Sequence, residues 1–115
     1  MGKRSAVPGG RTRAGAQRFR AMGEPSRLRI LEELLNGERS VGALVSALAL
    51  SQSNTSRHLQ ALFDAGLVAR RREASEVIYS IGDPIVEQLC QIMCASELNR
   101  VETTLKELKN VSRTN

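Results

Sequence analysis

The fold is decided by residues 51–59, which read SQSNTSRHL. Ser51 can cap a helix in which Thr55 and Leu59 face inward and the polar residues between them face outward. A second short helix precedes it, with Ser40 as its cap and apolar residues at three- and four-residue spacing. Two short helices joined by such a tight turn predict a helix-turn-helix.

The period of the apolar residues changes immediately after this helical pair. A basic run at residues 70–72 is followed by alternating side chains at residues 77–81, which indicates a β-hairpin with a polar tip, or wing. Upstream, residues 14–22 and 25–35 predict two more helices, with Pro25 suited to the first turn of the second. We therefore expect a mainly α fold with a two-stranded β-wing, that is, a winged helix-turn-helix.

The last predicted helix, residues 84–110, begins at Asp83-Pro84 and contains no glycine or further proline. Its apolar residues alternate three- and four-residue steps, as in a helix–helix seam: Leu98, Val101, Leu105 and Leu108. We interpret it as a dimerisation helix, so the fold is expected to dimerise through its terminal helices. The alternative is a terminal helix that packs only on its own domain.

Length and charge complete the expected organisation. The 115 residues fit one domain, comprising a disordered basic tail (1–13), a winged domain (14–110) and a flexible end (111–115). Residues 1–20 carry six basic groups and no acidic group, although the net charge of the whole chain is only +5. Such a tail either contacts DNA phosphates or merely keeps the chain soluble, and both interpretations stay open.

The chain has no apolar run near the roughly 20 residues that span a bilayer. No apolar stretch follows the basic residues at the N-terminus, so a secretory signal is not expected. We expect a cytoplasmic protein with no membrane partner.

Candidate DNA-binding residues occupy the outer face of the second helix of the pair and the wing. Gln and Arg side chains can pair with adenine and guanine edges, serine serves bases or phosphates, and wing arginines reach the backbone or minor groove. The candidates are Gln52, Ser53, Ser56, Arg57 and His58 on the helix, with Arg71 and Arg72 on the wing.

Two cysteines, Cys90 and Cys94, are candidates for effector sensing. Residues four apart on a helix share a face, so the two sulfurs can approach each other and bind a soft ion or receive a thiol-directed signal. Arsenite or another soft metal ion, or reversible modification by a persulfide or oxidant, are the candidate effectors. Zinc is disfavoured because it needs two further ligands, and the alternative role for both cysteines is packing.

The residues that begin the second predicted helix, AMGEPSRLRIL at 21–31, resemble the opening of the ArsR/SmtB family of winged-helix repressors. Residues 51–59 and the Ala65–Val68 stretch are similar to that family's recognition helix and its exit. The resemblance covers roughly residues 15–100 and implies a dimer that blocks transcription and leaves DNA when an effector binds. The family's Cys-Val-Cys arsenic site aligns with Ser40-Val41-Gly42, and its histidine-rich zinc site has no counterpart, so neither site is carried over.

The sequence thus predicts a homodimeric DNA-binding transcriptional repressor. It would bind a palindromic operator in double-stranded DNA and leave it when a thiol-directed effector acts on Cys90 and Cys94, with no cofactor required. The alternatives are a regulator without a small effector and a winged-helix protein-interaction module. An enzyme is not expected, because the chain has neither a glycine-rich phosphate loop nor a carboxylate pair of clear geometry.

Overall fold

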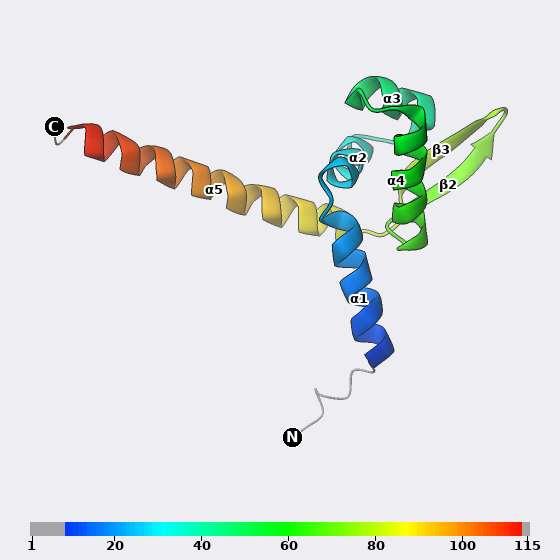
Figure 1. Ribbon diagram of the computed structural model, residues 1–115, viewed down its shortest axis with the longest axis horizontal. Helices are drawn as coiled ribbons and strands as arrows, with labels where there is room; N and C mark the ends of the chain where they lie inside the picture. The colour runs from blue at the N-terminus through cyan, green and yellow to red at the C-terminus, as the bar shows by residue number, and fades with distance from the viewer. Residues whose placement is uncertain (1–8, 114–115) are drawn as a thin grey trace. The chain divides into compact units, whose positions relative to one another are not determined.

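The computed structural model describes residues 9–113 and divides the chain into two compact units, with the boundary after Pro84. The first unit contains four helices and three strands: α1 (Gly9–Met22), α2 (Pro25–Leu35), β1 (Arg39–Ser40), α3 (Val41–Leu48), α4 (Gln52–Asp64), β2 (Val68–Glu73) and β3 (Glu76–Ile81). The second unit is the helix α5 (Ile85–Arg113) (Figure 1). The predicted fold class, mainly helical with a β-wing, is confirmed.

Capping residues start each helix of the central trio. The hydroxyl of Ser40 accepts a hydrogen bond from the Ala43 backbone, and the hydroxyl of Ser51 accepts one from the Asn54 backbone, both at 3.1 Å. The carboxylate of Glu24 caps α2, with Pro25 next in the chain. These caps satisfy backbone N–H groups that have no partner inside their own helix.

The core of the first unit is built almost entirely from aliphatic side chains. Its buried hydrophobic residues come from every element except β1: Ala21, Ile30, Leu31, Leu34, Leu44, Leu48, Leu59, Leu62, Leu67, Val68 and Tyr79. Burial of each large apolar side chain contributes about 1.5–3 kcal/mol. This shared core fixes α4 against α2 and α3.

The sheet has three strands in the order β1-β3-β2, all antiparallel. The wing itself is the predicted two-stranded hairpin, but β1 adds a third strand by pairing Arg39 with Tyr79 and Ser40 with Ile78. A strand of two residues has no periodicity, so sequence patterns do not detect it.

Two predicted boundaries are wrong. Residues 9–13, expected to be disordered, form the first turns of α1, and α5 continues three residues beyond 110. Arginine is a good helix former, and extending an existing helix costs little once its nucleus is anchored. The rest of the predicted tail (1–8) and end (114–115) lies outside the described residues.

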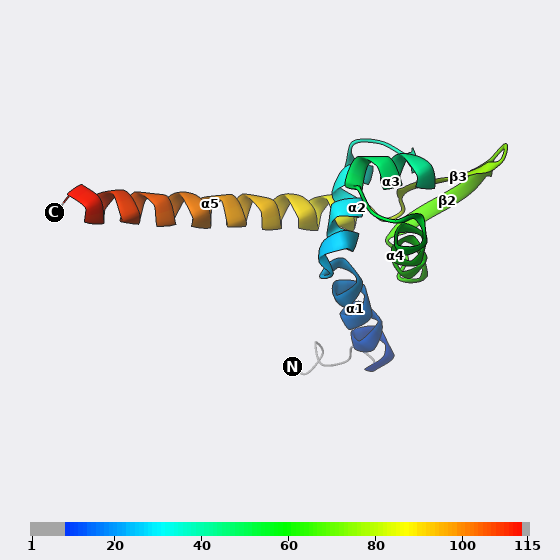
Figure 2. The ribbon, with the colours of Figure 1, turned by 45° about the horizontal axis from the view of Figure 1, so that its top comes forward.

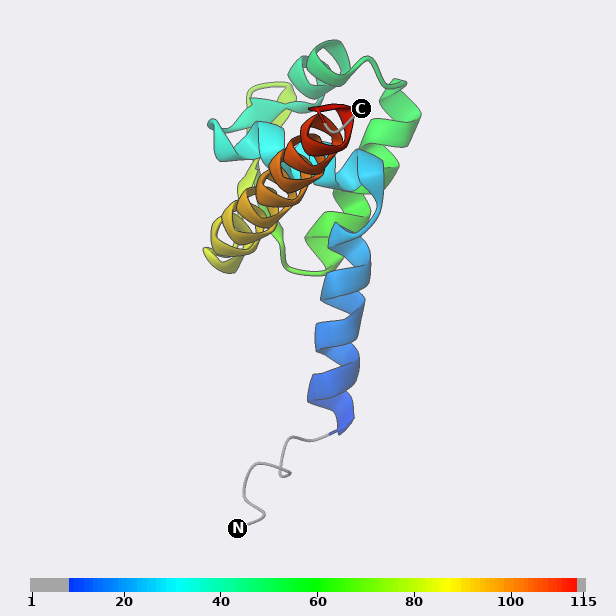
Figure 3. The same cartoon turned by 90° about the vertical axis from the view of Figure 1, so that its left-hand side faces the viewer.

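The helix α5 is a single unbroken helix, which Figure 3 shows foreshortened and running obliquely. All its residues from 91 to 112 are exposed. They include the predicted seam, with exposed fractions between 44% and 60% at Leu98, Val101, Leu105 and Leu108. No helix among residues 9–113 is long and apolar enough to cross a membrane.

Candidate nucleic-acid interface

The helix pair α3–α4 has the geometry predicted for a helix-turn-helix. The two helices are joined by three residues, 49–51, and cross steeply, so that Figure 2 shows α4 end-on and α3 from the side. Ala49, in the left-handed conformation, makes the turn. The first turns of α4 are therefore free to project from the domain.

The buried side of α4 is anchored at its beginning by Thr55. Its side chain is fully buried, and its hydroxyl donates a hydrogen bond of 2.8 Å to the Ser51 carbonyl. Leu59 and Leu62 continue this buried face. Because the polar Thr55 hydroxyl is satisfied inside its own helix, it is buried without an unpaired donor.

The opposite side of α4 is exposed and polar. It carries the four predicted contact residues Gln52, Ser53, Ser56 and Arg57. Asn54, which sequence analysis did not select, lies on the same exposed turn and accepts a 2.9 Å hydrogen bond from Arg57. This bond pre-orients the Arg57 guanidinium, which lowers the entropy lost when it binds a base edge.

His58 lies elsewhere. Its side chain is only 14% exposed, and its Nδ1 lies 3.6 Å from Glu24 Oε2 at the start of α2. Burial opposes ionisation of Glu24, but backbone hydrogen bonds from Arg27 and Ser26 and the charges of His58 and Arg27 outweigh it and lower its pKa. This placement disfavours the predicted DNA contact and makes His58 a link between the two helices.

Arg71, on the wing strand β2, forms ion pairs with two carboxylates. It donates to both oxygens of Glu38 at 2.6 and 2.8 Å, and to Glu73 at 2.8 Å. The hydrogen bonds from Arg71 lower the pKa of Glu38, and those to both carboxylates raise the pKa of Arg71. Glu73 lies two residues away on the same strand, whereas Glu38 is thirty-three residues away in the sequence.

Arg70 and Arg72 lie on the other face of the hairpin, opposite Tyr79 and Val77 of β3. The Arg70 guanidinium stacks 3.7 Å above the centre of the Phe63 ring and donates to Gln60 at 3.0 Å. Arg70 therefore ties the wing to α4. Arg72 is exposed and has no hydrogen-bond or ion-pair partner within residues 9–113.

The candidate effector residues lie one turn apart on α5, where Cys90 is buried and Cys94 is exposed. Within the described part of the chain, no group of three or more His, Cys, Asp or Glu side chains is arranged to hold a metal ion. A soft ion at these cysteines would need any further ligand from another subunit.

Comparison with known proteins agrees with this geometry. The sequence profile of the "bacterial regulatory protein, arsR family" matches residues 24–70, from the start of α2 to the beginning of the wing. The regulator Rv0081 of Mycobacterium tuberculosis is 42% identical over 78 residues, which cover 67% of this chain and 68% of that protein. The chain belongs to the ArsR family. It is thus a winged-helix DNA-binding transcription regulator and not an enzyme, as the sequence predicted.

A further relative and two solved structures extend the comparison. A probable mercury resistance operon repressor of Streptomyces lividans is 40% identical over 77 residues, covering 67% of this chain but only 62% of that repressor. The crystal structure of Rv0081 matches 80% of this chain and 92% of its own at 39% identity, with a TM-score of 0.70. The solution structure of Mb0332 from Mycobacterium bovis is that of a homodimeric winged helix-turn-helix DNA-binding domain. It matches 90% of this chain and 93% of its own at 30% identity, with a TM-score of 0.76.

Proposed function

We propose that this ArsR-family protein represses transcription as a homodimer bound to a palindromic operator. The exposed polar first turns of α4, rigidly held by buried Thr55, carry the DNA-binding half of the proposal. Residues at the N-terminus of a recognition helix read base edges in the major groove, and a two-fold dimer places two half-sites about one helical turn apart. Gln52, Ser53, Ser56 and Arg57 are assigned to this contact.

The exposed apolar seam of α5 supports dimerisation. Four large aliphatic side chains on one helical stripe are costly to leave in water, and a second copy of α5 can cover them. The homodimeric state of the Mycobacterium bovis relative agrees with this assignment.

Release from the operator is assigned to a thiol-directed effector acting on Cys90 and Cys94. Their spacing on one face of α5 suits a soft ion, which prefers thiolate ligands. The Streptomyces lividans relative, named for mercury resistance, makes mercuric ion a candidate beside arsenite. A persulfide or an oxidant that modifies the same thiols remains the competing signal.

The base-reading role of Arg57 is tested by fluorescence anisotropy on DNA from upstream of the protein's own gene and on a random duplex. Arg57→Ala should lower operator affinity by about 5- to 150-fold, equivalent to about 1–3 kcal/mol for one base contact, and leave random-duplex affinity nearly unchanged. An equal loss on both duplexes would show that Arg57 contacts only the backbone.

The effector is identified by the same assay on reduced protein. Mercuric ion, arsenite and a persulfide donor are each titrated into the operator complex of wild type and of the Cys90→Ser/Cys94→Ser variant. Release of the wild type but not of the variant identifies the signal and confirms the thiol site. If no agent releases either protein, the cysteines pack and do not sense.

A further inference from the structure

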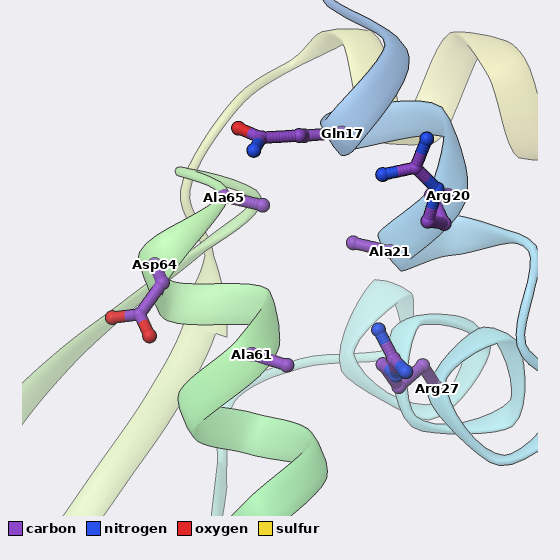
Figure 4. Close-up of a pocket in the computed structure, with 7 residues that line it drawn as sticks. All are labelled: Gln17, Arg20, Ala21, Arg27, Ala61, Asp64 and Ala65. Atoms are coloured by element: carbon purple, nitrogen blue, oxygen red, sulfur yellow. The ribbon is translucent and has the colours of Figure 1, made fainter. Parts of the chain in front are cut away.

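A small cavity, open to solvent, lies between α1, α2 and α4 of the first unit, apart from the proposed DNA-binding face. Its volume is about 310 Å³. Figure 4 shows the methyl groups of Ala21, Ala61 and Ala65 directed into this space from its two sides. These three methyl groups form the apolar part of a mixed lining, because alanine side chains are too short to fill the gap between the helices.

The side formed by α1 and α2 is cationic. Arg20 and Arg27 both line the cavity, and Figure 4 shows them across from α4. The Nε of Arg27 is buried and has no hydrogen-bond acceptor in the described part of the chain. Glu24 Oε2, at 3.8 Å, lies beyond hydrogen-bond distance. A buried donor without an acceptor is uncommon, so the ion pair with Glu24 satisfies the Arg27 guanidinium only in part.

The remaining polar groups are compatible with an anion. Gln17 extends from α1 toward Ala65 in Figure 4 and brings an amide to the cavity. Asp64, the carboxylate of the lining, points away from Arg20 and Arg27 and accepts a 2.8 Å hydrogen bond from Gln60. An anionic group placed at the arginines therefore does not face this carboxylate.

We propose that the cavity binds a small monocarboxylate with a short apolar chain. Its carboxylate would pair with Arg27 and Arg20, since guanidinium groups bind carboxylates with two parallel hydrogen bonds, and its chain would lie against the three alanines. The volume suits a ligand of on the order of ten non-hydrogen atoms, at the small end of ligand pockets. The occupant would touch α4 through Ala61, which gives this regulator an input separate from Cys90 and Cys94.

The test is a titration of hexanoate into the ¹⁵N-labelled full chain, followed by NMR without DNA, so that its result is independent of the DNA-binding proposal. Saturable shifts at the Gln17 side chain and the Ala61 amide are expected. Hexanamide, which has the same shape without the charge, and inorganic phosphate, which has no apolar chain, should bind at least tenfold more weakly.

Variants separate this site from general charge effects. Arg27→Gln and Arg20→Gln should each raise the hexanoate Kd about tenfold, the loss of one charge-assisted contact. Ala61→Leu should fill the cavity and abolish binding, while Arg13→Gln, on the exposed part of α1, should leave the Kd unchanged. Arg20→Gln keeps the test valid if Arg27→Gln unfolds α2. Absence of saturable binding, or binding that Arg20→Gln and Ala61→Leu do not alter, overturns the proposal.

Discussion

Three consecutive arginines on the wing have three different surroundings. Arg70 stacks on Phe63, Arg71 is held by two carboxylates, and Arg72 is exposed. Strand alternation sends Arg71 to one face of the hairpin and its two neighbours to the other. Of these three arginines, only Arg72 has a charge that is neither paired nor stacked within residues 9–113, so it is the wing arginine best placed to reach a phosphate.

Salt dependence of DNA binding should separate Arg72 from Arg71. Arg72→Ala should weaken binding to every sequence alike and reduce the slope of log K against log[salt] by about 0.9, the value of one phosphate contact. Arg71→Ala should change that slope less, because Glu38 and Glu73 already neutralise its charge. Anisotropy titrations on a random duplex at several salt concentrations measure both. A larger slope change for Arg71 would mean that its ion pairs open on DNA.

Gly82 is required by a close backbone approach. A Cβ built there would lie 2.7 Å from the carbonyl carbon of Val68 on β2. The backbone N–H of Gly82 donates a hydrogen bond of 3.0 Å to the carbonyl oxygen of Leu67. Gly82→Ala should therefore lower the free energy of unfolding by about 1–3 kcal/mol, measured by urea denaturation. Gly15→Ala, in α1 where nothing lies within 4 Å, is the matched control and should be neutral or stabilising by up to about 1 kcal/mol. Similar effects at both positions would contradict the steric explanation.

At the scale of the elements, the link between α3 and α4 depends on one strained residue. Ala49 ends α3 with φ 55° and ψ 40°, a left-handed conformation that costs a non-glycine residue about 1–2 kcal/mol. Arg29 donates a 3.1 Å hydrogen bond to the Leu48 carbonyl beside it, which helps to satisfy the end of α3. The turn is thus held by tertiary contacts against its local preference.

Ala49→Gly should raise the free energy of unfolding by about 0.5–1 kcal/mol, because glycine adopts this conformation without the steric cost. Ala47→Gly, an exposed position inside α3, should instead lower it by a similar amount. Urea unfolding of the two variants and the wild type gives the comparison. Destabilisation by both substitutions would show that the turn is not strained in solution.

At the scale of the whole molecule, the C-terminal part of α5 leaves its large apolar side chains exposed. Leu98, Val101, Leu105 and Leu108 are 44–60% exposed, and Val111 continues the stripe at 61%. A continuous exposed apolar stripe of this kind marks an association surface.

Charged substitutions in this stripe should separate the dimer. Leu98→Lys/Leu105→Lys should convert the protein to a monomer in light scattering and lower operator affinity by at least a hundredfold, since both half-sites must then be bound independently. Thr103→Lys, on the opposite side of α5, adds the same kind of charge and should leave the dimer intact. A dimeric double variant would place the interface elsewhere.

Much of the fold was predictable because its signals are local. The caps Ser40 and Ser51, the place of Pro25 in the first turn of α2 and the inward residues Thr55 and Leu59 were all identified from spacing and residue type, and the structure confirms them. In α2, leucine spacing predicts that Leu28, Leu31, Leu34 and Leu35 share the inward face, but of these only Leu31 and Leu34 are buried, together with Ile30. A helix packed on several sides buries more than one stripe, and no periodic pattern shows this in advance.

The sequence by itself determined the order of the helices and of the wing hairpin, the polar face of α4 and the family, because caps, periodicity and turn residues act within a few positions of one another. Only the tertiary structure decided which charged side chains are paired or stacked and which are left exposed. Glu38 pairs with Arg71 across thirty-three residues, Phe63 is stacked by Arg70, and His58 lies 3.6 Å from Glu24. The physical reason is that electrostatic and stacking partners are set by distance in space, which a linear pattern of residue types does not contain.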